Sequence, residues 1–199
     1  MVRPALGGSG RLKEPLGLWP AVAYASAYAS AYICAAVRPL TVTCVIDRPR
    51  ERVFDYLADI ANHAEFTDHF MREFRLERLP SRGRGAAARF KITAGPFSIW
   101  TDEVLMELEP PYRIVAEGRG GRSNRVPVRF EYRLIPHDTD MTRVELTFST
   151  HPATAIDRLR EALGARSWLK QRWARALRRM RVVLEEGEPS AHAARPAAG

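Results

Sequence analysis

Asp102 is the residue whose type and position best suit acid–base chemistry in this sequence. It alternates in step with the apolar residues Val104, Met106 and Leu108, so an unbroken strand would turn its carboxylate toward the interior. Burial would raise the pKa of that carboxyl and make Asp102 a candidate general base. A bulge would instead turn Asp102 outward, and bulges are common in curved sheets. The sequence leaves both interpretations open.

Tyr132 and His69 are two further polar candidates. Tyr132 lies two residues from Phe130 in an alternating segment, so its hydroxyl is expected on a buried face. His69 follows Asp68 directly, and His63 lies six residues upstream. A His–Asp pair could transfer protons near neutral pH. The more ordinary interpretation is a polar loop, because the sequence does not fix the geometry that such chemistry needs.

Several familiar catalytic and binding motifs are absent from the sequence. There is no Ser–His–Asp order, nucleophile elbow or phosphate-binding glycine loop. The glycine cluster at 118–121 lies between strands rather than before a helix. Cys34 and Cys44 lack the spacing of metal ligands, and reduced thiols are the simplest interpretation. We therefore predict neither a metal site nor a cofactor.

The first elements that must position these candidates are a strand and a helical segment. Residues 40–46 alternate and are β-rich, and apolar residues recur at helical spacing over 53–65. Asp47 is expected to cap the helical segment and Pro49 to lie in its first turn. Ala58-Asp59 is expected to divide the segment into two short helices.

Six alternating segments between residues 74 and 148 predict an antiparallel sheet with one buried and one solvated face. Beyond Pro152 the period becomes helical. An apolar stripe at least about 100° wide, typical of a helix packed on a core, begins near Leu169. This helix is the only predicted element long enough to cover the sheet. The predicted class is α+β: a helix-grip fold with a curved antiparallel sheet of about seven strands around a long C-terminal helix, and two short helices after the first strand.

Two segments carry a family resemblance: residues 46–63 (IDRPRERVFDYLADIANH) and residues 109–114 (EPPYRI). They resemble the START-like superfamily, also called SRPBCC, and within it the polyketide cyclase/dehydrase-type branch. The resemblance covers roughly residues 40–186 and departs at Phe66, where such proteins often carry Trp. It implies a deep cavity between the sheet and the long helix for a lipid, sterol, polyketide or hormone. Some members catalyse cyclisation or dehydration.

The inward-facing residues would line that cavity. Those expected to contact a ligand are Phe90, Ile92, Trp100, Val104, Met106, Ile114, Phe130, Tyr132, Leu146, Trp173, Leu177 and Met180. A mostly apolar pocket with few polar groups suits a small hydrophobic molecule. We therefore predict a binding or carrier protein for a lipid- or polyketide-like ligand. The alternative is a polyketide aromatase/cyclase or dehydratase that uses Asp102, Tyr132 or His69, and whether the chain is an enzyme stays open.

Positive charge is concentrated on the predicted C-terminal helix. The chain has 31 Lys and Arg against 23 Asp and Glu, a formal net charge of +8. Basic residues without any acidic one occupy the stretch from Arg166 to Arg181. This face could contact an anionic membrane weakly, which is a third candidate function, although a solvated helix face is the more usual interpretation. No nucleic-acid partner is predicted, because no recognition motif accompanies the charge.

The two ends of the chain differ in composition from residues 39–186, which we predict to be the START-like domain. Residues 16–37 carry no charge and repeat Ala-Tyr-Ala-Ser. They are expected to belong to a disordered extension over 1–38, with a targeting or membrane segment as the alternative. The tail 187–199 is also expected to be disordered. A cytoplasmic location is predicted, with membrane tethering through 16–37 as the less favoured alternative.

Overall fold

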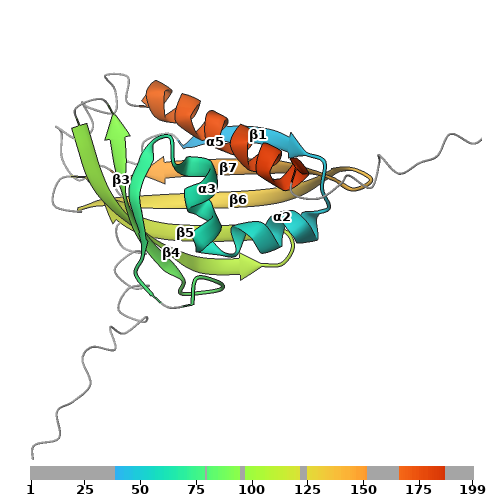
Figure 1. The fold of residues 1–199 in the computed structure, drawn as a ribbon, viewed down its shortest axis with the longest axis horizontal. Helices are drawn as coiled ribbons and strands as arrows, with labels where there is room; N and C mark the ends of the chain where they lie inside the picture. The colour runs from blue at the N-terminus through green and yellow to red at the C-terminus, as the bar shows by residue number, and fades with distance from the viewer. Residues whose placement is uncertain (1–38, 79, 95–96, 122–124, 152–165, 187–199) are drawn as a thin grey trace, which may run out of the picture. The chain divides into compact units, whose positions relative to one another are not determined.

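The computed structural model describes residues 39–78, 80–94, 97–121, 125–151 and 166–186. Their elements are, in order, β1 (Leu40–Ile46), α2 (Arg50–Leu57), the 3₁₀ helix η1 (Ile60–Asn62), α3 (His63–Thr67), β2 (Met71–Leu76), β3 (Ala87–Ala94), β4 (Phe97–Glu109), β5 (Arg113–Gly120), β6 (Val126–Asp138), β7 (Met141–Thr150) and α5 (Arg166–Glu186). The strands form one seven-stranded antiparallel sheet in the order β1-β7-β6-β5-β4-β3-β2 (Figure 1). This arrangement confirms the predicted helix-grip fold.

The inner face of the sheet is apolar because alternate residues of neighbouring strands lie in register. Ile114 on β5 pairs with Tyr132 on β6, which pairs with Leu146 on β7. All three side chains are completely buried. On the adjacent row, Phe130 and Phe148 lie with their ring centroids 5.0 Å apart. These rows form the inner face of the sheet, against which the helices pack.

Two groups of helices together cover the inner face of the sheet. The long helix α5 packs along β1 and against α3, and buries Trp173, Ala176, Leu177 and Met180. The short helices α2 and α3 lie in front of the middle of the sheet, where α2 contacts β5 and β6 (Figure 1). From the sequence, only the long helix was expected to cover the sheet. The short helices therefore contribute side chains to the interior as well.

The two short helices are separated where the sequence analysis expects, but their start differs. α2 ends at Leu57, and the Asp59 side chain caps η1 by accepting a hydrogen bond from the backbone N–H of Ala61. The residue that caps α2 is Pro49, without any side-chain bond. The prediction that Asp47 caps this helix is wrong, because the helix begins at Arg50 and Asp47 lies two residues before its N-cap. The backbone N–H of Asp47 donates to the Glu185 carboxylate at 2.9 Å. That bond ties the start of α2 to the end of α5.

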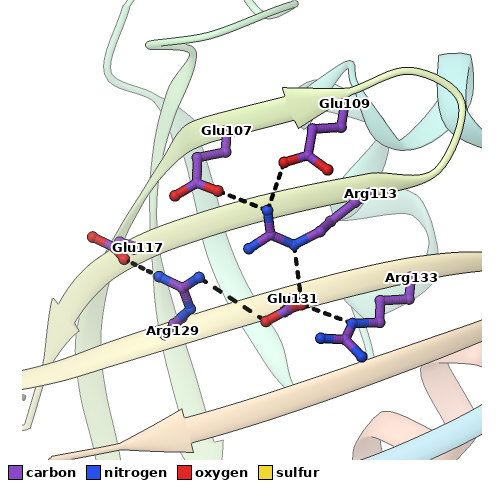
Figure 2. Close-up of polar contacts among 7 residues, drawn as sticks. All are labelled: Glu107, Glu109, Arg113, Glu117, Arg129, Glu131 and Arg133. Atoms are coloured by element: carbon purple, nitrogen blue, oxygen red, sulfur yellow. Dashed lines mark hydrogen bonds and ion pairs between the residues drawn. The ribbon is translucent and has the colours of Figure 1, made fainter.

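The outer face of the sheet carries a network of ion pairs across β4, β5 and β6 (Figure 2). Arg113 lies 2.8 Å from both Glu107 and Glu109, and 3.0 Å from Glu131. Arg129 contacts Glu131 and also Glu117 on the neighbouring strand. Partial burial opposes ionisation of Glu131, but bonds from Arg133 and Arg113 hold the pKa of its carboxyl below the ordinary value. The outer face is thus the polar one, as the alternation predicts.

The edge strand β2 is short and irregular. Its pairing with β3 shifts between Arg72 and Arg75, and Glu73 has a positive φ of 51°. Glu73 also pairs with Lys91 of β3, with Nζ and Oε1 2.5 Å apart.

None of the helices in the described ranges is both long and apolar enough to cross a membrane. The predictions for residues 1–38 and 187–199 fall outside the described residues, as does Cys34. Cys44 is a half-buried free thiol.

Candidate ligand-binding site

The register of β4 decides which of its side chains face the interior. Those that are buried are Thr101, Glu103 and Leu105. The side chain of Asp102, by contrast, is 32% exposed. The ladder between β4 and β5 shifts between Leu105 and Glu107, and Met106 is the extra residue of this bulge. An extra residue exchanges the two faces of a strand. The residues of β4 before Met106 therefore face the side opposite to the one that alternation with Leu108 predicts.

Of the two orientations that the sequence left open, Asp102 therefore has the outward one, which a bulge was expected to produce. Its carboxylate lies on the outer side of the sheet, 3.4 Å from Nε of Arg89. Arg89 also lies over the ring of Trp100, 5.0 Å from its centroid. The same bulge removes three predicted ligand-binding residues from the inner face: Trp100, Val104 and Met106.

Glu103 is the carboxyl group that faces the interior, and the sequence analysis missed it. It lies between Ala88 of β3 and Gly118 of β5, and only 2% of it is exposed. Its Oε1 has no hydrogen-bond partner among the described residues. Burial raises the pKa of this carboxyl to about 8. Glu103 is therefore mainly protonated at neutral pH and carries an O–H donor.

Gly118 sets the position of Glu103 through the backbone. A Cβ on Gly118 would lie 1.7 Å from the carbonyl oxygen of Asp102 and 3.2 Å from Cα of Glu103. No side chain fits in that space, so only glycine lets β5 approach β4 this closely. This close approach holds the Glu103 backbone against the middle of the sheet.

His63, at the start of α3, reaches Glu103 from the helical side. Its Nδ1 lies 3.7 Å from Glu103 Oε1. Its Nε2 lies 3.0 Å from the Leu57 carbonyl, which can only accept, so Nε2 carries the proton. Burial lowers the pKa of His63 to about 4, against the raising effects of the Leu57 bond and of Asp59. At neutral pH the ring is uncharged and its Nδ1 lone pair faces Glu103.

Tyr132 completes this polar cluster, as the parity of its strand predicts. Its side chain is completely buried, and its ring centroid lies 6.0 Å from that of His63. Its hydroxyl has no hydrogen-bond partner among the residues that the structure describes. Burial, and after it the nearby Glu103, raises the pKa of Tyr132 well above the ordinary value. Its hydroxyl is thus a donor at every physiological pH.

The predicted Asp68–His69 pair is not formed. Asp68 lies 2.7 Å from the guanidinium of Arg179, and Nε2 of His69 donates to the Arg172 carbonyl at 3.2 Å. Both contacts reach α5, so these residues fix that helix against the loop after α3. His69 is consequently not a member of the Glu103 cluster.

Most of the predicted apolar ligand-binding residues do lie in the core. Ile92 is partly buried, and the others are buried: Phe90, Ile114, Phe130, Leu146, Trp173, Leu177 and Met180. Trp173 packs edge-on against Phe130 at 5.5 Å and Phe70 at 5.3 Å. Its indole Nε1 is a third buried polar atom without a partner in the described part of the chain. Whether any of these side chains touches a ligand stays a prediction.

The basic face of α5 is partly used within the chain. Arg179 pairs with Asp68, and Arg181 lies 3.7 Å from Glu185. Lys170, Arg175 and Arg178 are exposed. Contact of these residues with an anionic membrane stays a prediction.

Comparison with known families gives one match over most of the chain. Residues 39–185 match the family described as "Polyketide cyclase / dehydrase and lipid transport". No curated protein matches the chain in sequence.

Solved structures share the fold at low sequence identity. A protein from Thermus thermophilus is 12% identical with a TM-score of 0.59, over 75% of this chain and 99% of its own. The Zhui aromatase/cyclase from Streptomyces sp. R1128 is 18% identical with a TM-score of 0.54, over 75% and 98%. The major latex-like protein 151 from Panax ginseng is 10% identical, also with a TM-score of 0.54, over 74% and 97%. At these identities the likeness establishes the fold alone.

Proposed function

Because the chain belongs to the family of polyketide cyclases, dehydrases and lipid transport proteins, we propose that it holds a small lipid- or polyketide-like molecule between its sheet and its helices. This membership confirms the resemblance to the polyketide cyclase-type branch of the START-like superfamily. The proposed role is binding or carriage of the ligand.

The observation that carries this proposal is a set of buried polar atoms without partners. Glu103 Oε1, Tyr132 Oη and Trp173 Nε1 are all buried on the inner side of the sheet or of α5, and none has a hydrogen-bond partner among the described residues. Such atoms are rare in folded proteins because each costs about 1–3 kcal/mol. They are surrounded by apolar side chains. This combination is typical of a ligand site, where a few polar groups orient a hydrophobic molecule.

Native mass spectrometry of the purified full-length chain tests this proposal. We expect either a co-purified small molecule or saturable binding of 1-anilinonaphthalene-8-sulfonate that a fatty acid or an aromatic polyketide displaces. A chain that carries no molecule and binds none of these probes would contradict the binding function.

A second candidate function is cyclisation or dehydration of a polyketide chain. The observation that favours it is the approach of Glu103 and His63 to 3.7 Å in a buried place. An aldol cyclisation removes a proton from carbon, forms a carbon–carbon bond and adds a proton to the carbonyl oxygen. Nδ1 of His63 could accept the first proton, and the Glu103 carboxyl could donate the second. The two groups thus have the protonation states that such a reaction needs at neutral pH.

The enzymatic candidate is tested with a linear poly-β-ketone chain supplied by a minimal polyketide synthase. We expect E103Q to abolish the cyclised product without loss of ligand binding, and D102N, which changes the neighbouring outward carboxylate, to keep it. Equal product distributions with and without the wild-type chain would exclude this activity and leave the binding function intact.

A further inference from the structure

We propose that Glu103 and Tyr132 together form a recognition site for a carbonyl oxygen of the ligand, in which Glu103 acts as a hydrogen-bond donor. The inference rests on the proposed binding function and specifies its ligand class. It states that the chain selects ketones or esters over hydrocarbons and alcohols of the same shape.

The side chains of Glu103 and Tyr132 lie close to each other in the interior. Glu103 enters the interior from β4 and Tyr132 from β6, and His63 lies next to both of them. Each of the two side chains is at least nine-tenths buried, and each has a polar oxygen without a partner in the described ranges. Because both side chains lie beside the same buried histidine, and the charge of Glu103 would act on Tyr132, we assign them to a single site.

No Lys or Arg of the described ranges lies within ion-pair distance of Glu103. The described ionisable group within ion-pair distance of it is His63, whose single proton is committed to the Leu57 carbonyl through Nε2. An ionised Glu103 would therefore face a lone pair in an apolar surrounding, which is strongly unfavourable. The raised pKa of Glu103 agrees with this geometry. Glu103 is held as a neutral acid.

The buried donors near His63 lack acceptors among the described residues. A neutral Glu103 and Tyr132 each offer an O–H donor, and at 3.7 Å the His63 lone pair is too far from Glu103 for a good hydrogen bond. A ligand that brings an acceptor oxygen satisfies these donors. A hydrocarbon leaves them unsatisfied, and a site built to hydrogen-bond a ligand rejects the analogue that lacks the matching group.

Three probes of one shape test the inference: 2-acetylnaphthalene, 1-(2-naphthyl)ethanol and 2-ethylnaphthalene. Their dissociation constants are measured at pH 6 on the full-length chain. We expect the ketone to bind roughly tenfold more tightly than the hydrocarbon, the factor of about one net hydrogen bond. The carbonyl stretch of a ¹³C-labelled ketone should shift to lower frequency on binding.

Variants assign this preference to the two residues. E103L and Y132F should each remove much of the ketone preference, whereas E103Q should keep it because its amide still donates. D102N is the matched control on the outer face and should behave as wild type. Circular dichroism and thermal melting establish that each variant is folded.

A pH series distinguishes the donor role from simple packing. As the pH rises through about 8, Glu103 ionises and ceases to donate, so the wild type should lose its ketone preference while E103Q keeps it. The titratable groups around Glu103 are His63 from α3 and Tyr132 from β6, with Asp59 acting on His63. Neither His63 nor Tyr132 changes its charge in this interval.

The outcomes separate the two proposals. Equal binding of ketone and hydrocarbon, or an E103Q variant as impaired as E103L, would overturn the carbonyl site and leave the binding function standing. If the alcohol binds most tightly, the proposal that the ligand is a ketone or an ester is wrong. Binding of none of the three probes would overturn the carbonyl site. It would overturn the binding function as well only if the chain also carries no co-purified molecule and does not bind 1-anilinonaphthalene-8-sulfonate.

Discussion

At the scale of single residues, Glu103 and His63 are buried side by side and are both uncharged at neutral pH. Glu103 keeps its proton and His63 lacks a second one, in each case because burial penalises the charged form. Their 3.7 Å approach is thus not an ion pair in the ordinary sense. Neither residue stabilises the fold by charge, and both cost desolvation energy that an apolar pair would not. Such a cost is typical of residues retained for function.

Replacing Glu103 by Leu should therefore stabilise the protein while it weakens ligand recognition. The change removes a buried oxygen that has no partner in the described structure, which should raise the free energy of unfolding by about 1–3 kcal/mol. Urea denaturation of wild type and E103L measures the difference. D102N serves as the control and should change the value by less than about 0.5 kcal/mol. A clearly destabilised E103L would mean that Glu103 is a structural residue.

The stability of the fold should depend on pH in a direction that these two groups determine. The pKa of Glu103 rises from 4.5 to about 8 on folding. The contribution of Glu103 to the free energy of unfolding is therefore greatest below pH 4.5 and is lost as the pH rises to about 8. The pKa of His63 falls from 6.5 to about 4 on folding. The contribution of His63 to the free energy of unfolding therefore increases as the pH rises from about 4 to 6.5. The two effects oppose each other below pH 6.5, and only the loss remains from about 6.5 to 8.

Denaturation series at pH 6.5 and pH 8.5 measure this dependence. We expect the free energy of unfolding of the wild type to fall across the interval and that of E103Q to stay nearly constant. The same fall in E103Q would assign the effect to other groups.

At the scale of elements, the bulge in β4 is the feature that the sequence could suggest but could not locate. Alternation in β5, β6 and β7 correctly places Ile114, Tyr132 and Leu146 inside. The reason is that β5 pairs with β6 in one register, and β6 pairs with β7 in one register from Val128 to Pro136. In β4 the apolar residues before the bulge lie on the partly buried outer side, so their pattern resembles an inner face. A bulge depends on how two strands pair, and one strand's pattern does not contain that information. Glu103 was missed for this reason, although its own sequence position was correctly assigned to a strand.

The close approach of β4 and β5 makes Gly118 the most sensitive position of these strands. A Cβ there would collide with the backbone of Asp102, whereas a Cβ on Gly120 would meet the Thr101 side-chain hydroxyl at 2.9 Å. A side chain can rotate and a paired backbone cannot. We expect G118A to lose at least about 3 kcal/mol or to fail to fold, and G120A to lose clearly less. Thermal melting of the pair decides, and equal melting temperatures would contradict this account of β4.

At the scale of the whole molecule, α5 is fastened at both of its ends to segments distant in sequence. Near its start, the Arg166 side chain donates to the Pro39 carbonyl at 2.7 Å. At its end, Arg48 donates to the Glu185 carbonyl at 2.7 Å. Arg48 is only 7% exposed, and its own carbonyl accepts a bond from the buried Thr142 hydroxyl. The amphipathic stripe predicted that this helix covers the core, but such long-range fastenings are set by tertiary structure and leave no pattern in the sequence.

These fastenings should differ in strength according to their burial. R48A removes a buried donor that satisfies the last turn of α5 and should cost about 2–3 kcal/mol, since it leaves polar groups unsatisfied. R179A breaks an exposed ion pair with Asp68 and should cost at most about 1 kcal/mol. Urea denaturation of both variants tests the contrast. Equal losses would show that burial does not govern how α5 is held.

The irregular edge strand β2 has a consequence for how the protein behaves in concentrated solution. A flat edge strand offers its unpaired backbone groups to any other chain and can nucleate sheet-to-sheet aggregation. In β2 the shifted pairing and the left-handed Glu73 break the flat row of groups that a second strand would need. The charged side chains of Arg72, Glu73 and Arg75 are exposed along it. A sheet that stays open at this edge is thereby protected from growing by addition of further copies.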